Sequence, residues 1–259
     1  MKTKNTTAVI VVLLMILSID SLHAQGFAGE GATMEPTTMV DKPTAGMLKR
    51  GGYLAGLDMY QGGGVLFNVS VGLWDRFMFG ISYGGANIIG NQRINMNPLP
   101  GVEAKLRIID ESLELPAIAL GFNSQGKEPY IDGLDRYTIK SPGFYLVGSK
   151  NYSFAGHLSF HGGLNLSTEG GDGDKDLNVF AGVEKSLGKQ VSAFLEYDFA
   201  FNDNHASAIG LNRGYLNLSI QWSLGSGLVL GFNVKDIFQN QKGVGSLNRS
   251  LRLDYVGVF

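Results

Sequence analysis

The chain consists largely of short β-like runs whose connections are alternately short and long. From residue 51 to the end we predict twelve strands. Short connections lie at residues 74–76, 110–115, 150–152, 187–189 and 224–227, and long ones at 84–101, 123–143, 163–176, 201–213 and 236–248, with one brief member at 61–64. Outer-membrane barrels have tight turns at one end and longer loops at the other. The pattern therefore predicts an all-β fold, an antiparallel up-and-down transmembrane β-barrel of about twelve strands.

The strands alternate apolar and polar side chains, as a barrel wall requires. Residues 102–108 interleave apolar and charged side chains, and residues 191–199, 215–222 and 228–235 repeat this period of two. A secreted sandwich would show the same period. Aromatic residues near the expected strand ends favour the membrane, where they form interfacial girdles; they are Tyr60, Phe77, Phe79, Tyr83, Tyr145, Tyr152, Phe199 and Trp222.

The chain stops inside an alternating strand, residues 251–259. Its terminal aromatic residues, Tyr255 and Phe259, resemble the signal read by the bacterial barrel-assembly machinery. Gly257 stands where that signal more often has a bulky residue. We expect outer-membrane lipid and this machinery to be partners of the chain.

The N-terminus predicts export. Lys2 and Lys4 precede an unbroken apolar run at residues 8–17, and residues 1–24 read as a signal peptide cleaved after Ala24. The apolar run is shorter than the roughly 20 residues of a membrane-spanning helix. With no cysteine and a net charge of −2, the chain offers no lipoprotein anchor, no disulfide and no basic surface for nucleic acid.

Residues 25–50 lack the alternating pattern and are polar and punctuated by proline. We expect a periplasmic N-terminal tail, with a plug folded back into the lumen as the alternative. Residues 51–259 form the predicted barrel, and no second domain is indicated.

Charged residues on the polar faces of the strands are the best candidates for a functional lumen. They include both signs, and buried charges are normally paired, so they predict either a closed, salt-bridged lumen or a narrow polar pore. The expected lumen-lining residues are Glu103, Lys105, Arg107, Glu184, Glu196, Asp198, Lys235, Arg252 and Asp254.

Two other groups of residues suggest chemistry. His157 and His161 share a polar strand face with Ser159, and a serine hydrolase needs a serine, a histidine and a polar group that orients the histidine. Spaced four residues apart on a strand, the histidines are about 13 Å apart and cannot serve one serine. Asp172, Asp174 and Asp176 resemble the start of a calcium loop, but Leu177 and Val183 occupy later key positions. We assign no catalytic residue, cofactor or metal, and keep these aspartates as a weak calcium candidate in an exposed acidic loop.

Several segments resemble an uncharacterised family of Gram-negative outer-membrane β-barrel proteins, and more distantly the YjbH-like family associated with exopolysaccharide production. The segments are residues 44–48, 80–90, 100–111, 116–126 and 144–152. The YjbH-like part is carried by an Arg-to-Glu spacing at Arg107 and Glu111, one residue shorter here, by Pro-Ala-x-Ala-x-Gly and by Tyr-Leu-Val-x-Ser-Lys. The chain lacks the lipobox cysteine of larger members. The resemblance implies possible polysaccharide-export partners and no catalytic residue.

We therefore expect a non-enzymatic integral protein of the outer membrane of a Gram-negative bacterium. It would be a narrow channel or a scaffold for envelope or polysaccharide export. Alternatives are a secreted glycan-binding β-protein and an outer-membrane lipid hydrolase.

Overall fold

The computed structural model describes residues 26–242 and 247–259, so the predicted signal peptide lies outside the described residues. Within these ranges no helix is long and apolar enough to cross a membrane. Apart from the short 3₁₀ helix η1 (Asp132–Leu134), the regular elements are strands: β1 (Gly52–Tyr60), β2 (Gly64–Trp74), β3 (Phe77–Ala86), β4 (Asn95–Met96), β5 (Gly101–Ile109), β6 (Ala117–Asn123), β7 (Lys127–Ile131), β8 (Arg136–Ile139), β9 (Gly143–Ser153), β10 (His157–Leu166), β11 (Asn178–Ser186), β12 (Val191–Asp198), β13 (Tyr215–Gly225), β14 (Leu228–Lys235) and β15 (Asn248–Val258).

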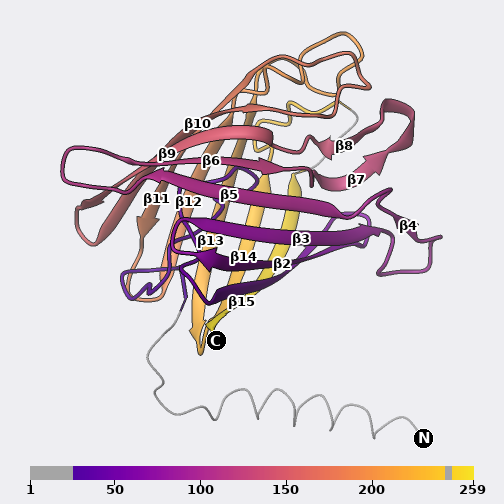
Figure 1. The fold of residues 1–259 in the computed structure, drawn as a ribbon. Helices are drawn as coiled ribbons and strands as arrows, with labels where there is room; N and C mark the ends of the chain where they lie inside the picture. Colours follow the sequence, from indigo (N-terminus) through magenta and orange to yellow (C-terminus); the bar gives the residue numbers. More distant parts are fainter. Residues whose placement is uncertain (1–25, 243–246) are drawn as a thin grey trace, which may run out of the picture.

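Twelve of these strands close into an antiparallel barrel (Figure 1). Each strand pairs with its neighbours in the chain once β4, β7 and β8 are set aside, and β1 pairs with β15 to close the ring. Two-residue β4 pairs only with the end of β3, and β7 and β8 form a separate hairpin beyond the wall. Closure leaves no unpaired edge along the wall.

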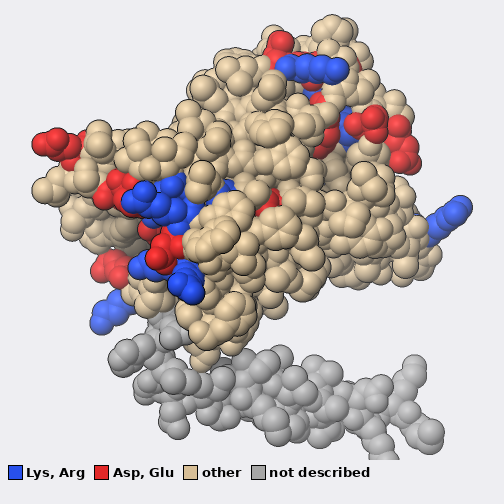
Figure 2. All heavy atoms as spheres, in the orientation of Figure 1, with Lys and Arg blue, Asp and Glu red and all other residues tan. Residues whose placement is uncertain are grey.

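Side chains alternate between the two faces of the wall. In β12 the inward residues Ser192, Phe194, Glu196 and Asp198 are buried, and the residues between them are partly or fully exposed. On the surface shown in Figure 2, charged side chains gather toward the lower left and the upper right, and the region between them is almost free of charge. This is the distribution that a lipid-facing belt requires.

The short and long connections lie at opposite ends of the barrel, as predicted, with one difference in position. The turn expected at residues 150–152 lies instead at residues 154–156, because β9 continues to Ser153. Ala155 and Gly156 both have positive φ, and Phe154 N–H donates to the Gly156 carbonyl. Glycine adopts this backbone conformation readily, so the Ala155–Gly156 pair was the better turn signal.

Two of the residues expected in the aromatic girdle point into the barrel instead of toward its outer surface. Tyr60 is 8% exposed and Tyr145 2% exposed, and both lie inside the barrel. Tyr83, Tyr152 and Trp222 are exposed, as a girdle needs. The period of two explains the error: nearness to a strand end does not fix which face a side chain occupies.

The last strand shows why position 257 is glycine. Tyr53 on β1 packs against Tyr255 and stacks on Phe259, with ring centroids 6.0 Å and 5.1 Å apart. A Cβ at Gly257 would lie 2.5 Å from Tyr53 Oη. The missing bulky residue therefore leaves room for Tyr53, which joins the two terminal aromatics on the outer face.

Residues 26–49, which we call the plug segment, fold against the barrel from its short-turn end and are not a free tail; residues 30–33 and 35 stay exposed at that end. Residues 37–48 enter the lumen, turn at a bridge between Thr38 and Pro43, and are almost entirely buried. Met39 and Ala45 pack in an apolar cluster with wall residues that include Phe180 and Phe194. Phe27, Ala28, Met47 and Leu48 form a second cluster with inward-facing Leu54, Met78, Val229 and Val256. Of the two placements considered from the sequence, the structure shows the one inside the lumen.

Candidate functional site: the occupied lumen

All nine candidate lumen residues lie on inward faces of the wall. Seven are buried and two, Glu103 and Arg107, are half-buried. Most do not line an open channel, because the plug segment occupies the space in front of them.

Glu196 is the main anchor of the plug segment. Its carboxylate accepts the backbone N–H groups of Val40, Asp41 and Lys42, the shortest at 2.8 Å, and the side-chain amide of Asn217 at 2.8 Å. Charge-assisted bonds of this kind are stronger than bonds between neutral groups. One wall carboxylate thus holds the tip of the plug segment, and Glu196 itself is fully buried.

Ion pairs hold the same tip from two sides. Lys42 Nζ lies 2.7 Å from Asp198, and Lys235 Nζ lies 2.8 Å from Asp41 and 3.4 Å from Glu128. All five side chains are almost completely buried. These contacts join the plug segment to β12, β14 and the hairpin β7–β8.

The cations of β5 bind the plug segment on both sides of its turn at Thr38–Pro43. Lys105 Nζ donates to the carbonyls of Thr37 and Gly46 at 2.8 Å and 3.2 Å. Arg107 donates to the Ala45 carbonyl and pairs with Glu35. Glu103 has a weaker contact, from the Ser70 hydroxyl at 3.4 Å, and none with the plug segment.

On β15, Arg252 pairs with Asp254 at 2.7 Å and donates to Thr38 Oγ1 of the plug segment at 2.7 Å. Beside it a cavity of only about 50 Å³ remains between the plug segment and the wall from β1 to β6. This part of the lumen is therefore filled.

The long-loop end carries a second buried ion network that sequence reasoning missed. Arg136 Nη1 lies 2.6 Å from both Asp172 and Asp203, and Lys140 Nζ lies 2.8 Å from Asp172. Tyr215 donates to Asp203 at 2.7 Å. Three long loops are thus locked together. No local pattern marks these residues, because the two cations come from the loop between β6 and β9, Asp172 from the loop between β10 and β11, and Asp203 from the loop between β12 and β13.

This network includes Asp172, one of the three aspartates kept as a weak calcium candidate in a loop that we expected to be exposed. Asp172 and Asp174 are buried, and Asp174 accepts the backbone N–H groups of Asn204 and His205. Within residues 26–242 and 247–259 no group of three His, Asp or Glu side chains is placed to hold a metal. Burial would raise the pKa of Asp172, but the bonds from Lys140 and Arg136 outweigh it and hold this pKa below its ordinary value.

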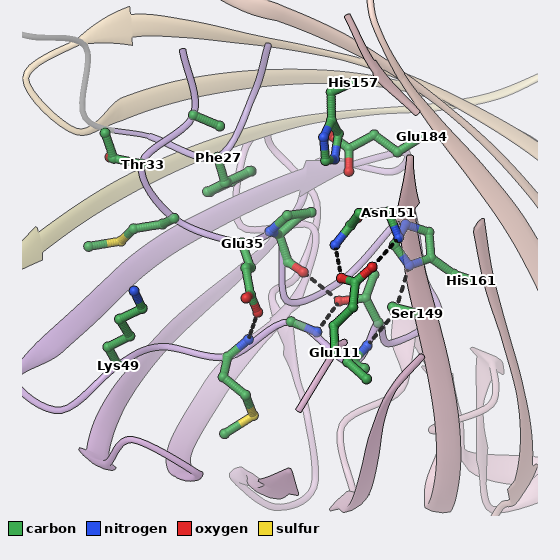
Figure 3. A pocket seen from close by; sticks show the side chains of 18 of the residues that line it. Phe27, Thr33, Glu35, Lys49, Glu111, Ser149, Asn151, His157, His161 and Glu184 are labelled. Atoms are coloured by element: carbon green, nitrogen blue, oxygen red, sulfur yellow. Dashed lines mark hydrogen bonds between the residues drawn. The ribbon is translucent and has the colours of Figure 1, made fainter. Parts of the chain in front are cut away.

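The short-turn end differs, because a cavity of about 430 Å³ remains between the plug segment and the wall (Figure 3). Its walls combine the plug residues 27–36 and 44–49 with inward residues of β5, β9, β10 and β11. Glu184, His157 and His161 all line it. Among the candidate lumen residues, Glu184 and Arg107 are the two that reach this space.

The two histidines contact two different serines. Ser159 Oγ donates to Asn151 Oδ1 at 2.6 Å and lies 2.6 Å from His157 Nε2, while His161 Nδ1 lies 2.8 Å from Ser149 Oγ. A hydroxyl carries one proton, so the bond to Asn151 leaves His157 Nε2 as the donor to Ser159. A histidine that acts as general base must instead accept the proton of the serine hydroxyl, and the orienting polar group must bond to the histidine. Here Asn151 bonds to the serine. Ser159 is also fully buried.

Comparisons with known proteins bear on the fold. Neither a protein-family model nor a curated protein matches the chain. Among 27 similar solved chains, a KdgM porin aligns with a TM-score of 0.51 at 11% identity, covering 80% of this chain and 99% of its own. A KdgM porin in complex with disordered oligogalacturonate gives 0.49 at 12% identity with the same coverage, and a NanC porin gives 0.41 at 7%, covering 80% and 99%. The first likeness shows that this chain has the fold of a twelve-stranded antiparallel closed barrel seen in that porin.

Proposed function

We propose that the chain is a non-enzymatic, porin-like outer-membrane barrel, and that the plug segment holds its narrow channel closed. The observation that carries this is the capture of three consecutive plug amides by Glu196. Twelve strands enclose more space than the eight whose interior side chains alone can fill. Here the additional space is taken by residues of the chain's own N-terminal part.

The placement in the outer membrane of a Gram-negative bacterium is part of the same proposal. It is supported by the uncharged belt of Figure 2 and by the aromatic cluster of Tyr53, Tyr255 and Phe259 on the outer face. Long loops face outward and tight turns face the periplasm in such barrels. Both the plug segment and the C-terminus would then start from the periplasmic side, after removal of residues 1–24. The assembly machinery would read Tyr255 and Phe259.

A scaffold role in envelope or polysaccharide export is the second candidate. The filled lumen favours it, because a barrel that never opens can act only through its rims. The sequence resemblance to the YjbH-like family points in the same direction. The two candidates differ in one property, whether the lumen ever conducts.

Single-channel recording separates them. The mature chain would be refolded in detergent, its barrel confirmed by the gel shift between unboiled and boiled samples, and its conductance measured in a planar bilayer. We expect long closed periods with discrete openings, whose ion selectivity changes in Lys105→Glu. A folded barrel that stays silent, in the wild type and after loss of the Glu196 anchor, would contradict the channel and leave the scaffold.

A further inference from the structure

Glu184 is a buried carboxylate without a cation. It is 3% exposed, and its one side-chain hydrogen bond comes from Ser192 Oγ at 2.9 Å. In the described part of the chain it forms no ion pair, unlike Asp172 or Asp198. An unpaired buried charge is costly, so the free side of this carboxylate, which faces the 430 Å³ cavity, is suited to a positive group.

A second unsatisfied group faces the same cavity. His161 is 7% exposed, and its Nε2 has no hydrogen-bond partner among the described residues. Ser149 Oγ accepts the Ala45 N–H at 2.9 Å, so its own proton is free to be donated to His161 Nδ1. A neutral imidazole then carries its proton on Nε2. His161, whose side chain lines the cavity, thus has an N–H donor that no described residue accepts.

The remaining charges of the cavity favour a cation. Among the described residues, four carboxylates line it, from Glu30, Glu35, Glu111 and Glu184, against two cations, Arg107 and Lys49. Arg107 is already paired with Glu35. The apolar side chains of Phe27, Met34 and Met47 complete the lining. A cavity of this size holds a small organic molecule.

The cavity has access from the short-turn end. A neighbouring cavity of about 400 Å³ shares Glu30, Asn151 and His157 with it, and its other lining residues are Tyr152, Ser153 and Gly156 at the β9–β10 turn. A ligand would therefore reach Glu184 from the side of the tight turns without passing the plug tip. Figure 3 shows Glu184 beside His157 on the wall, across the cavity from Glu35 of the plug segment.

We propose that this cavity binds a small organic molecule that carries a primary ammonium group and oxygen acceptors. The ammonium pairs with Glu184, and an oxygen of the ligand accepts from His161 Nε2–H. Because its walls include the plug segment, the bound ligand also joins that segment to the wall. The site stands whether or not the barrel conducts.

Glucosamine and glucose are matched probes, since they differ only at C2, where an ammonium group in glucosamine replaces a hydroxyl in glucose. Binding to the detergent-refolded barrel would be measured by isothermal titration calorimetry, with the gel shift as the check on folding. We expect glucosamine to bind more tightly than glucose, and Glu184→Gln to weaken glucosamine about tenfold or more, as for loss of a charge-assisted contact. His161→Phe should lower the binding affinity of both sugars by about two- to tenfold.

The control is Glu114→Gln, which removes one exposed carboxylate from the same end without touching the cavity. It should leave both affinities unchanged. Equal binding of the two sugars, glucosamine binding that survives Glu184→Gln, or no binding of either sugar to a folded barrel would each overturn the proposal. Should Glu184→Gln fail to fold, potassium competition against glucosamine on the wild type provides the second measurement: a cation-binding carboxylate predicts weaker glucosamine binding with rising salt, and salt-independent binding refutes it.

Discussion

The two ends of the lumen contrast in how they treat buried charge. At the long-loop end, Arg136, Lys140, Asp172 and Asp203 satisfy one another within a closed network. At the short-turn end, Glu184 has no cation and His161 Nε2 no hydrogen-bond partner among residues 26–242 and 247–259, and both side chains line an open cavity. The lumen is therefore filled unevenly. Ion pairs satisfy the buried charges at the long-loop end, which we call the sealed end, whereas the short-turn end, which we call the open end, has buried polar groups without a partner among the described residues.

We expect the largest effect from a substitution that breaks the ion network at the sealed end. Arg136→Met leaves Asp172 and Asp203 buried with one cation fewer, and breaking such a buried pair costs about 3–5 kcal/mol. Urea unfolding in detergent, followed by the gel shift, would measure the loss. The matched control is Arg76→Met, whose ion pair with Asp110 is more than half exposed and should matter little. Equal effects at the two sites would show that the network does not seal this end.

A second prediction concerns the plug segment between the two ends, and its readout is channel opening rather than unfolding. Glu196→Ala removes the acceptor of the Val40, Asp41 and Lys42 amides. Each buried amide left without a partner destabilises the closed state by about 1–3 kcal/mol. We expect more frequent channel openings in planar-bilayer recordings. Glu103→Ala removes the same charge from a wall residue without a plug contact, and should leave the opening frequency at the wild-type level.

The sealed end should also respond to acid. Because the pKa of Asp172 lies below its ordinary value of 3.8, its contribution to stability is present above that value and is lost as the pH falls through the lowered pKa. Asp172→Asn should therefore lower the thermal midpoint at pH 7, and the gap from wild type should narrow near pH 3. A gap that is the same at both pH values would mean that ionised Asp172 does not hold the loops.

The smallest effect is expected at the open end. Glu184→Met replaces an unpaired buried carboxylate by an apolar side chain of similar size, which is often neutral or stabilising. Without ligand, urea unfolding should show no loss of stability. A loss comparable to that of Arg136→Met would reveal a cation partner for Glu184 and would remove the contrast between the two ends.

The barrel could be predicted from sequence because its determinants are local. A period of two tells which side chains share a face, and the nine candidate lumen charges all lie on the faces that the structure turns inward. The partners of these charges could not be predicted in this way. Val40 and Glu196 are 156 residues apart, and nothing in the aperiodic plug segment encodes which wall residue meets it.

The same reasoning explains the turn and the loops. The polar residues at 150–152 suggested a turn, yet they continue β9, where a polar side chain such as Asn151 faces the lumen. The aspartates of residues 170–176 suggested an exposed loop, but Asp172 is buried against two cations of another loop and Asp174 is buried beside it. Asp176 alone is exposed. In both cases polarity was taken as a sign of solvent, whereas the barrel interior is itself polar.

The claim that residues 26–49 close the lumen can be tested most directly by locking them. Ala45 N–H donates to Ser149 Oγ at 2.9 Å, and the chain has no native cysteine, so Ala45→Cys combined with Ser149→Cys allows a single disulfide between plug segment and wall. Single-channel current would be recorded with the bridge formed, verified by mass, and again after reduction. We expect no openings in the oxidised barrel and openings that return on reduction. Equal conductance in the two states would show that the plug segment does not close the channel.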